Sequence, residues 1–226
     1  MTVVRHIPET KLHRLGRHVE HDPDSRSFAL PHDATAPLVS AVHVRHVPVF
    51  DQGDLGSCTC EAMVGALMTG PFYSAARVLG QADCVDLYKQ ATRLDKIPGH
   101  YPPDDTGSSG LAAAKAAHKR GWLRAYHHAF TPHAALLALG RAPIIIGVNW
   151  YAGFDSPVGP RAELVIAGEV RGGHEVCVTE IDVTAQTIRG PNSWGPGWGD
   201  GGYWSMSFDT FRRLMYEQGD AVAPVV

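Results

Sequence analysis

The sequence has few cysteines, no long apolar run and no marked excess of charge of either sign. Its 226 residues carry a formal net charge of -3 at pH 7, and the pI is near 6.5. This balance gives no electrostatic reason to expect nucleic acid or an anionic membrane surface as a partner. The longest apolar runs, such as residues 142–148, are too short to cross a bilayer, and residues 1–20 lack the apolar stretch of a secretory signal.

The four cysteines, Cys58, Cys60, Cys84 and Cys177, show no paired spacing of the kind that zinc sites use. If one of them is a free nucleophile, an odd number remains, so we expect no disulfide framework. We therefore predict a cytoplasmic location or another reducing compartment. No metal and no organic cofactor are expected either, because the reaction of a thiol nucleophile with a base needs none. A zinc module built from Cys58, Cys60 and His174 is kept as a minor alternative.

The composition changes twice along the chain. Residues 1–41 are rich in proline, histidine and charge, with little periodicity, so we expect an N-terminal arm or leader there. A globular domain is expected over residues 42–226, with helices over 42–140 and strands over 141–226. A hydrophobic fraction of 44% is enough for a packed core. The segregation of helices from strands predicts an α+β fold of two lobes with a cleft between them.

Helix and strand boundaries follow from caps, breakers and alternation. Five polar residues are suited to cap helix starts: Ser57, Asp83, Ser109, Thr131 and Asp209. Segments of β-branched, aromatic or alternating character predict strands over 143–150, 164–170, 175–183, 187–189 and 203–208. A further short strand is expected over 47–50, running into the loop that holds Gln52.

The loop before the first predicted helix carries the best candidate nucleophile. Cys58 directly follows the cap residue Ser57, where unpaired helix amides and the helix dipole stabilise a thiolate. The side-chain amide of Gln52, upstream on the same loop, can reach back beside the thiol. With the backbone amide of Cys58 it would form a two-donor oxyanion hole. A lone cysteine is otherwise a small buried hydrophobe, so its neighbours decide this interpretation.

A second group of residues supplies a base and the side chain that orients it. His174 follows Gly172 and Gly173, which leave open space around the ring. The side-chain oxygen of Asn192 can accept the imidazole N–H and fix the tautomer, and Trp194 can shield that hydrogen bond from water. Taken alone, a histidine at a hairpin turn or a tryptophan beside a glycine-rich turn has an ordinary structural explanation.

Taken together, these segments resemble the papain family of cysteine peptidases. The resemblance rests on the run from Gln52 to Cys58, on the Gly-His pair at residues 173–174, and on Asn192-Ser193-Trp194-Gly195-Pro196-Gly197-Trp198-Gly199-Asp200-Gly201-Gly202-Tyr203. The last run matches the family's Asn-Ser-Trp-Gly-x-x-Trp-Gly-x-x-Gly-Tyr pattern at every defined position. The resemblance covers roughly residues 42–226, and the chain order Gln, Cys, His, Asn also agrees.

The resemblance implies a papain-like two-lobed fold, with a mainly helical N-terminal lobe and an antiparallel, β-barrel-like C-terminal lobe. It implies a cysteine endopeptidase acting on a peptide or protein substrate through a thioester intermediate. Cys58 would be the nucleophile, paired with His174 as thiolate and imidazolium. Asn192 would orient His174, Gln52 would donate to the oxyanion, and Trp194 would support them.

Substrate contacts are also implied by the resemblance. They fall on Gly107, Ser108, Ser109, Gly147, Gly173 and Glu175. The loop of residues 106–109, directly before the alanine-rich helix, falls where family members hold the substrate backbone. Glu175 either favours a basic substrate side chain or points away from the pocket.

Departures from the family pattern indicate which branch of the family the chain resembles. Leu55 replaces a cysteine that forms a disulfide in many secreted members, Thr59 replaces the usual aromatic after the nucleophile, and Cys60 stands where a small residue is common. The chain therefore resembles the short microbial and phage branch of the family. Residues 1–41 are too short and too proline-rich for the usual long helical propeptide.

Three questions of function stay open at this point. The natural substrate could be a cell-wall cross-bridge or a phage structural protein. Association with a larger assembly, such as a virion, is not tested by the sequence. A structural or binding protein that keeps the papain fold with little or no turnover is the alternative from another class.

Overall fold

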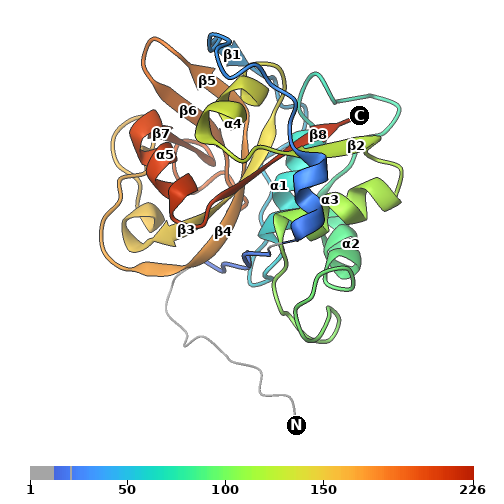
Figure 1. Ribbon diagram of the computed structural model, residues 1–226. Helices are drawn as coiled ribbons and strands as arrows, with labels where there is room; N and C mark the ends of the chain where they lie inside the picture. Colours follow the sequence, from blue (N-terminus) through green and yellow to red (C-terminus); the bar gives the residue numbers. More distant parts are fainter. Residues whose placement is uncertain (1–12, 21) are drawn as a thin grey trace.

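The protein is described by a computed structural model over residues 13–20 and 22–226. The expected arm before residue 13, and residue 21 within it, lie outside the described residues. Figure 1 shows helices α1, α2 and α3 gathered on one side and most strands on the other, which gives two lobes. Within the described residues, none of the helices is both long enough and apolar enough to cross a membrane.

The helical lobe is built around one helix that is buried on every side. The lobe contains α1 (Cys58–Leu67), α2 (Gln81–Ala91) and α3 (Gly110–Lys119). All residues of α1 are buried, which its small and apolar composition allows. Cys58 is the first residue of this helix, so the centre of the lobe positions the candidate nucleophile.

The strands form two four-stranded antiparallel sheets, one in the other lobe and one between the lobes. Their orders are β1-β5-β6-β7 and β2-β8-β3-β4. The strands are β1 (Ala41–Val42), β2 (Ala125–His128), β3 (Ile144–Tyr151), β4 (Val170–Val178), β5 (Glu180–Asp182), β6 (Thr187–Pro191), β7 (Tyr203–Ser207) and β8 (Asp220–Val225). Helices α4 (Pro132–Leu139) and α5 (Phe208–Tyr216), with the 3-10 turns Pro23–Phe28 and Ala152–Asp155, complete the described elements. As described, both sheets are open, so the expected β-barrel-like lobe has no closed barrel.

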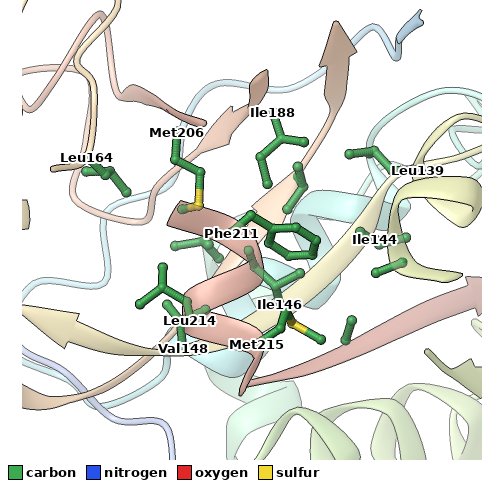
Figure 2. Packing of buried hydrophobic residues seen from close by; sticks show 14 of the residues in the cluster. Leu139, Ile144, Ile146, Val148, Leu164, Ile188, Met206, Phe211, Leu214 and Met215 are labelled. Atoms are coloured by element: carbon green, nitrogen blue, oxygen red, sulfur yellow. The ribbon is translucent and has the colours of Figure 1, made fainter. Parts of the chain in front are cut away.

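The sheet β2-β8-β3-β4 lies between the two cores and faces both. Successive side chains of a strand point to opposite faces, whereas directly paired residues share one face. Ile145, paired with Cys177 and Val222, belongs to the core of the helical lobe. Figure 2 shows the alternate residues Ile146 and Val148 inside the core of the β lobe. By the same alternation, the next row on the helical side, Gly147 with Glu175 and Asp220, lies at the junction of the lobes.

Two predicted helix starts are confirmed by their cap hydrogen bonds. The side chain of Ser109 accepts from the backbone amide of Ala112 at 3.0 Å, and that of Thr131 accepts from Ala134 at 3.1 Å. Each bond satisfies one of the unpaired amides in a first helical turn.

Ser57 is the cap residue of α1, as predicted, although its hydroxyl donates to Oε1 of Glu61 at 3.1 Å and accepts no helix amide. Two other predicted cap positions are wrong. Asp83 lies inside α2, which begins two residues earlier. Asp209 lies inside α5, which Ser207 caps instead. In α5 a second polar residue close by takes the cap position, whereas α2 begins after Gly80, whose amide donates to Oδ2 of Asp83 at 2.8 Å.

The strand predictions fail where pairing is between distant segments. Strands β2 and β8 pair with each other and were not predicted. The strands expected over 47–50 and 164–170 do not form, although β4 begins at residue 170. His174 lies in the middle of β4 rather than at the start of a strand. Pairing across the sheet, rather than local propensity, decides these segments.

Candidate active site

Cys58 is completely buried at the start of α1, opposite strand β4. Its exposed fraction is 0%. Burial raises the pKa of the Cys58 thiol to about 12, and backbone amides of Glu175, Gly16 and Thr59 offset this only in part. Because the amide of Glu175 acts on the sulfur, the fold brings Cys58 next to the residue that follows His174. The thiol therefore lies against the strand that carries His174, while its predicted pairing with the imidazole stays a prediction.

His174 is held by Asn192 in the manner that the motif predicts. Nε2 of His174 and Oδ1 of Asn192 are 2.8 Å apart, and Oδ1 also accepts from the backbone amide of Ser193 at 2.8 Å. Since an amide oxygen can only accept, Nε2 carries the proton. Among the described residues, Nδ1 of His174 has no hydrogen-bond partner. The nitrogen left to accept a proton is therefore Nδ1.

Two tryptophans enclose the imidazole of His174. The ring centroid of Trp194 is 4.8 Å from that of His174, as the shielding role predicts. The ring of Trp150 lies at 4.7 Å in an edge-on arrangement. Trp150 was not among the predicted site residues, although it lies at the end of the strand predicted over residues 143–150. Both rings exclude water from the His174–Asn192 hydrogen bond.

Gln52 is fixed from several directions beside the same site. Its Oε1 accepts from the hydroxyl of Ser193 at 2.5 Å, and its backbone amide donates to the carbonyl of Ser193 at 2.8 Å. Its Nε2 donates to the carbonyls of Leu55, at 2.8 Å, and Arg14, at 3.3 Å. Ser193 was part of the quoted motif without an assigned role, and it orients the amide so that Nε2 faces the groove.

A segment from the N-terminal region, residues 13–18, covers this site; we call it the arm segment. The backbone amide of Arg17 donates to the carbonyl of Gly173 at 3.0 Å. On its other side, Ser108 donates to the carbonyl of Gly16 at 2.8 Å and accepts from the amide of His18 at 2.7 Å. The arm segment thus pairs in parallel with residue 108 and lies in a groove between that loop and β4. In Figure 1 the dark blue segment passes below β4 toward the helical lobe.

Further contacts hold the N-terminal end of the arm segment. His13 stacks on Trp194 with ring centroids 4.3 Å apart. Arg14 pairs with Asp105 at 2.9 Å, and the same carboxylate accepts from the amide of Gly56 at 3.0 Å and from the hydroxyl of Tyr88 at 2.7 Å. Asp105 was not predicted as a site residue. It links the loop before Cys58 to the loop that holds the arm segment.

Burial also sets the charge state of the candidate pair. Burial lowers the pKa of His174 to about 4, although the hydrogen bond to Asn192 raises it. With the pKa of Cys58 at about 12, the neutral thiol and the neutral imidazole are both favoured near pH 7. The expected thiolate–imidazolium pair is therefore not favoured while the arm segment is in place.

The geometry gives no support to the zinc alternative. Over the stretches 13–20 and 22–226, no three side chains of histidine, cysteine, aspartate or glutamate gather as a metal site requires. All four cysteines are buried free thiols.

Solved structures share this architecture. Xylellain, a cysteine protease from Xylella fastidiosa, aligns with a TM-score of 0.73 at 18% identity, covering 97% of this chain and 99% of that one. Procathepsin L 3 of the Tenebrio molitor larval midgut aligns with a TM-score of 0.63 at 17% identity, covering 88% and 74%. The cysteine protease CMS1MS2 of Carica candamarcensis, in complex with E-64, aligns with a TM-score of 0.56 at 18% identity, covering 79% of this chain and 92% of that one.

The chain has the papain-like fold. The sequence matches no family model and no curated protein, so the likeness is one of structure. The predicted two-lobed α+β architecture is confirmed. At 15–18% identity, the solved structures do not by themselves carry an activity to this chain.

The residues expected to bind substrate in the papain-like groove all lie near the arm region. Gly107, Gly147 and Gly173 have no room for a side chain, because the arm segment approaches each of them. Ser108 and Gly173 form backbone hydrogen bonds with it. The hydroxyl of Ser109 donates to Oε2 of Glu20 at 2.5 Å. The groove expected to hold a substrate backbone is thus occupied by this chain's own backbone.

Proposed function

We propose that this protein is a cysteine peptidase that hydrolyses peptide bonds through Cys58 and His174. The observation that carries the proposal is the orientation of His174. Its Nε2 is bound to Asn192 and its Nδ1 has no partner among the described residues, beside a helix that begins with a buried cysteine. A base with one fixed and one available nitrogen is what activation of a thiol requires.

The proposed reaction has two halves. The thiol of Cys58 gives its proton to Nδ1 of His174, and the thiolate attacks the peptide carbonyl carbon. The C–N bond breaks as the imidazolium protonates the leaving amine, which leaves a thioester on the sulfur. His174 then takes a proton from water, the hydroxide attacks the thioester, and the carboxylic acid leaves as the thiol re-forms.

Gln52 is proposed to stabilise the oxyanion of both halves together with the backbone amide of Cys58. Its Nε2 now donates to the carbonyl of Arg14 at 3.3 Å. A carbonyl oxygen of the arm segment therefore uses a donor that an oxyanion would need. Under this proposal the arm segment must leave before a peptide can enter, and its departure lifts the burial that keeps the pair neutral.

The test is covalent labelling of the thiol, followed by peptide mapping. E-64 is a suitable probe because it is bound in the structure of the Carica candamarcensis protease. In the full chain we expect Cys58 to be the residue labelled, and His174→Ala to lose the labelling. His100→Ala, which removes an exposed histidine, is the matched control.

Equal labelling of Cys84 or Cys177 would contradict an activated Cys58. Labelling of Cys58 that persists in His174→Ala would remove His174 from the mechanism. Turnover is tested separately, by cleavage of a peptide library with the wild type and with Cys58→Ser. A chain that labels at Cys58 and cleaves none of these peptides would support the alternative of a binding protein with the papain-like fold.

A further inference from the structure

Three paired positions on strands β8, β3 and β4 form an acidic pocket close to Cys58. Gly147 on β3 is paired with Asp220 on one side and with Glu175 on the other. Paired residues share one face of a sheet, and this row lies on the same face as Ile145, toward the helical lobe. Two carboxyl groups therefore flank a position that has no side chain.

Glu175 is the unusual member of the row. Its exposed fraction is 1%, and neither of its carboxyl oxygens has a hydrogen-bond partner among the described residues. Burial raises the pKa of Glu175 well above its ordinary value; Asp220 raises it further, and Arg17 lowers it. A buried carboxyl group without donors is costly, and a cation beside it offsets that cost.

The side chain of Arg17 fills the pocket. Its exposed fraction is 1%, its Nη2 donates to the carbonyl of Gln218 at 2.8 Å, and it forms an ion pair with Asp220. A Cβ atom on Gly147 would lie 2.5 Å from Nε of Arg17 and 2.7 Å from Oε2 of Glu175. Any other residue at position 147 would therefore close the space that the guanidinium uses.

The pocket offers more acceptors than Arg17 satisfies. Nε and Nη1 of Arg17 have no hydrogen-bond partner in the described part of the chain, and both oxygens of Glu175 are equally unpartnered. Glu175 also lies against the start of α3, where Oε1 is 2.6 Å from the place of a Cβ on Gly110. The positive end of a helix favours the ionised carboxylate there. A guanidinium entering from another peptide could pair with Glu175 as well as with Asp220.

We propose that this pocket recognises an arginine side chain of the substrate, and that Arg17 is the chain's own occupant of it. The proposal rests on the proposed function, because it assigns the specificity of the same groove. Arginine fits better than lysine, since a planar fork of donors can reach acceptors on two sides of Gly147, whereas an ammonium is a compact point charge. Of the two alternatives for Glu175, this proposal selects the one in which it favours a basic substrate side chain.

Binding without turnover is the first test. The full chain carrying Cys58→Ser and Arg17→Ala is titrated with acetylated tripeptide amides Ala-Arg-Ala, Ala-Lys-Ala and Ala-citrulline-Ala, and calorimetry measures the dissociation constants. Citrulline has the shape of arginine without its charge. We expect the arginine peptide to bind at least about tenfold more tightly than the citrulline peptide, with lysine between them.

Adding Glu175→Gln or Asp220→Asn should remove most of that difference, whereas Glu163→Gln, at an exposed glutamate, should leave it. Equal affinity for arginine and citrulline would overturn the proposal. It would also be overturned if the arginine peptide did not bind at millimolar concentration although E-64 labels Cys58 in the Arg17→Ala chain, because that labelling shows that the groove opens. In that case Arg17 is only the anchor of the arm segment. If Arg17→Ala does not fold, Arg17→Met, which keeps the buried aliphatic stem, takes its place.

Hydrolysis separates the two proposals. With Cys58 intact and Arg17→Ala present, kcat/KM is compared for the arginine and citrulline forms of one library peptide. Hydrolysis without an arginine preference would contradict the proposed arginine pocket and support the proposed peptidase activity. Selective binding of arginine peptides without hydrolysis would contradict the proposed peptidase activity and support the proposed arginine pocket.

Discussion

Glu61 and Glu175 are two buried carboxyl groups near Cys58, one on the helix that carries the thiol and one on the strand facing it. Their exposed fractions are 2% and 1%. Glu61 accepts from the hydroxyl of Ser57 at 3.1 Å and from the amide of Gln81 at 2.7 Å. Oε2 of Glu61 and both carboxyl oxygens of Glu175 have no hydrogen-bond partner in the described chain, but the carboxyl group of Glu175 faces the guanidinium of Arg17.

The difference separates a helix wall, whose carboxyl group has donors from within the domain, from a strand wall, whose cation comes from the arm segment. The helix wall, with Glu61, supplies neutral donors from within the domain. The strand wall, with Glu175 and Asp220, gains its cation only from residue 17. We infer that the helix wall acts alike on all peptides, whereas the strand wall discriminates among them.

The largest expected effect lies on the helix wall. Gln52→Ala removes the proposed oxyanion donor, and we expect kcat to fall by about 10²–10³ for arginine and citrulline peptides alike. Gln90→Ala, a glutamine of α2 outside the groove, is the control. Alkylation of Cys58 by iodoacetamide forms no oxyanion, so its rate should change far less. A fall in kcat confined to arginine peptides would contradict the inference that the helix wall acts alike on all peptides.

Glu61 predicts how stability depends on pH. Burial raises the pKa of Glu61 to about 7 from an ordinary value near 4.5. Between these values the folded protein holds a proton that the unfolded chain has lost, so stability falls as the pH rises through this window. The loss is on the order of 3 kcal/mol at pH 8 relative to pH 4.5. Glu61→Gln should remove it.

Urea unfolding at pH 4.5 and pH 8 measures this effect. The exposed Glu163→Gln variant should keep the wild-type dependence. His174, whose pKa is lowered to about 4, acts with the opposite sign, since its contribution is lost as the pH falls below about 6.5. It is common to all three proteins and cancels in the comparison. Identical pH dependence in wild type and Glu61→Gln would remove the assignment of a raised pKa.

Gly147→Ala closes the space between the two carboxyl groups of the strand wall. A Cβ there meets Arg17, Asp220 and Glu175, and such overpacking costs about 1–3 kcal/mol. We expect faster labelling of Cys58, because the arm segment docks less well, together with loss of the arginine preference. Gly197→Ala is the control, since a Cβ at residue 197 meets no atom within 4 Å. Retained arginine preference in Gly147→Ala would show that the guanidinium binds elsewhere.

Arg17→Ala should have the smallest effect on Cys58. It removes one buried anchor while the backbone hydrogen bonds of the arm segment remain, so we expect labelling of Cys58 to speed up by about tenfold. Arg26→Ala, an exposed arginine of the same N-terminal region, should leave the rate unchanged. Unlike Gly147→Ala, this variant should keep the preference for arginine peptides. Equal rates for wild type and Arg17→Ala would mean that the side chain does not hold the arm segment over the thiol.

Local sequence predicted the parts of the site that depend on short segments. The run that begins at Asn192 places its own Ser193 and Trp194 around the histidine, so the His174–Asn192 pairing could be predicted from a motif. Ser109 and Thr131 cap helices because the amides they accept are only three residues away. Contacts of this range are encoded by spacing alone.

Residues joined across the fold could not be predicted in the same way. Trp150 reaches His174 through the register of β3 on β4, and Asp220 reaches Gly147 through the pairing of β8. Strands β2 and β8 are each short and have no local partner, so their pairing depends on the assembled sheet. Arg17 lies in a segment of mixed charge that has no periodicity to mark it.

The sequence by itself determined which atoms could react: a thiol at a helix start, an imidazole, and two amides in family order. Only the tertiary structure decided what stands over them, because the partners of Arg17 are brought together by strand register and not by spacing. A row of three paired residues, invisible along the chain, leaves a guanidinium-sized space between two carboxyl groups. For this reason the reaction could be predicted from local motifs, whereas its proposed specificity required the sheet.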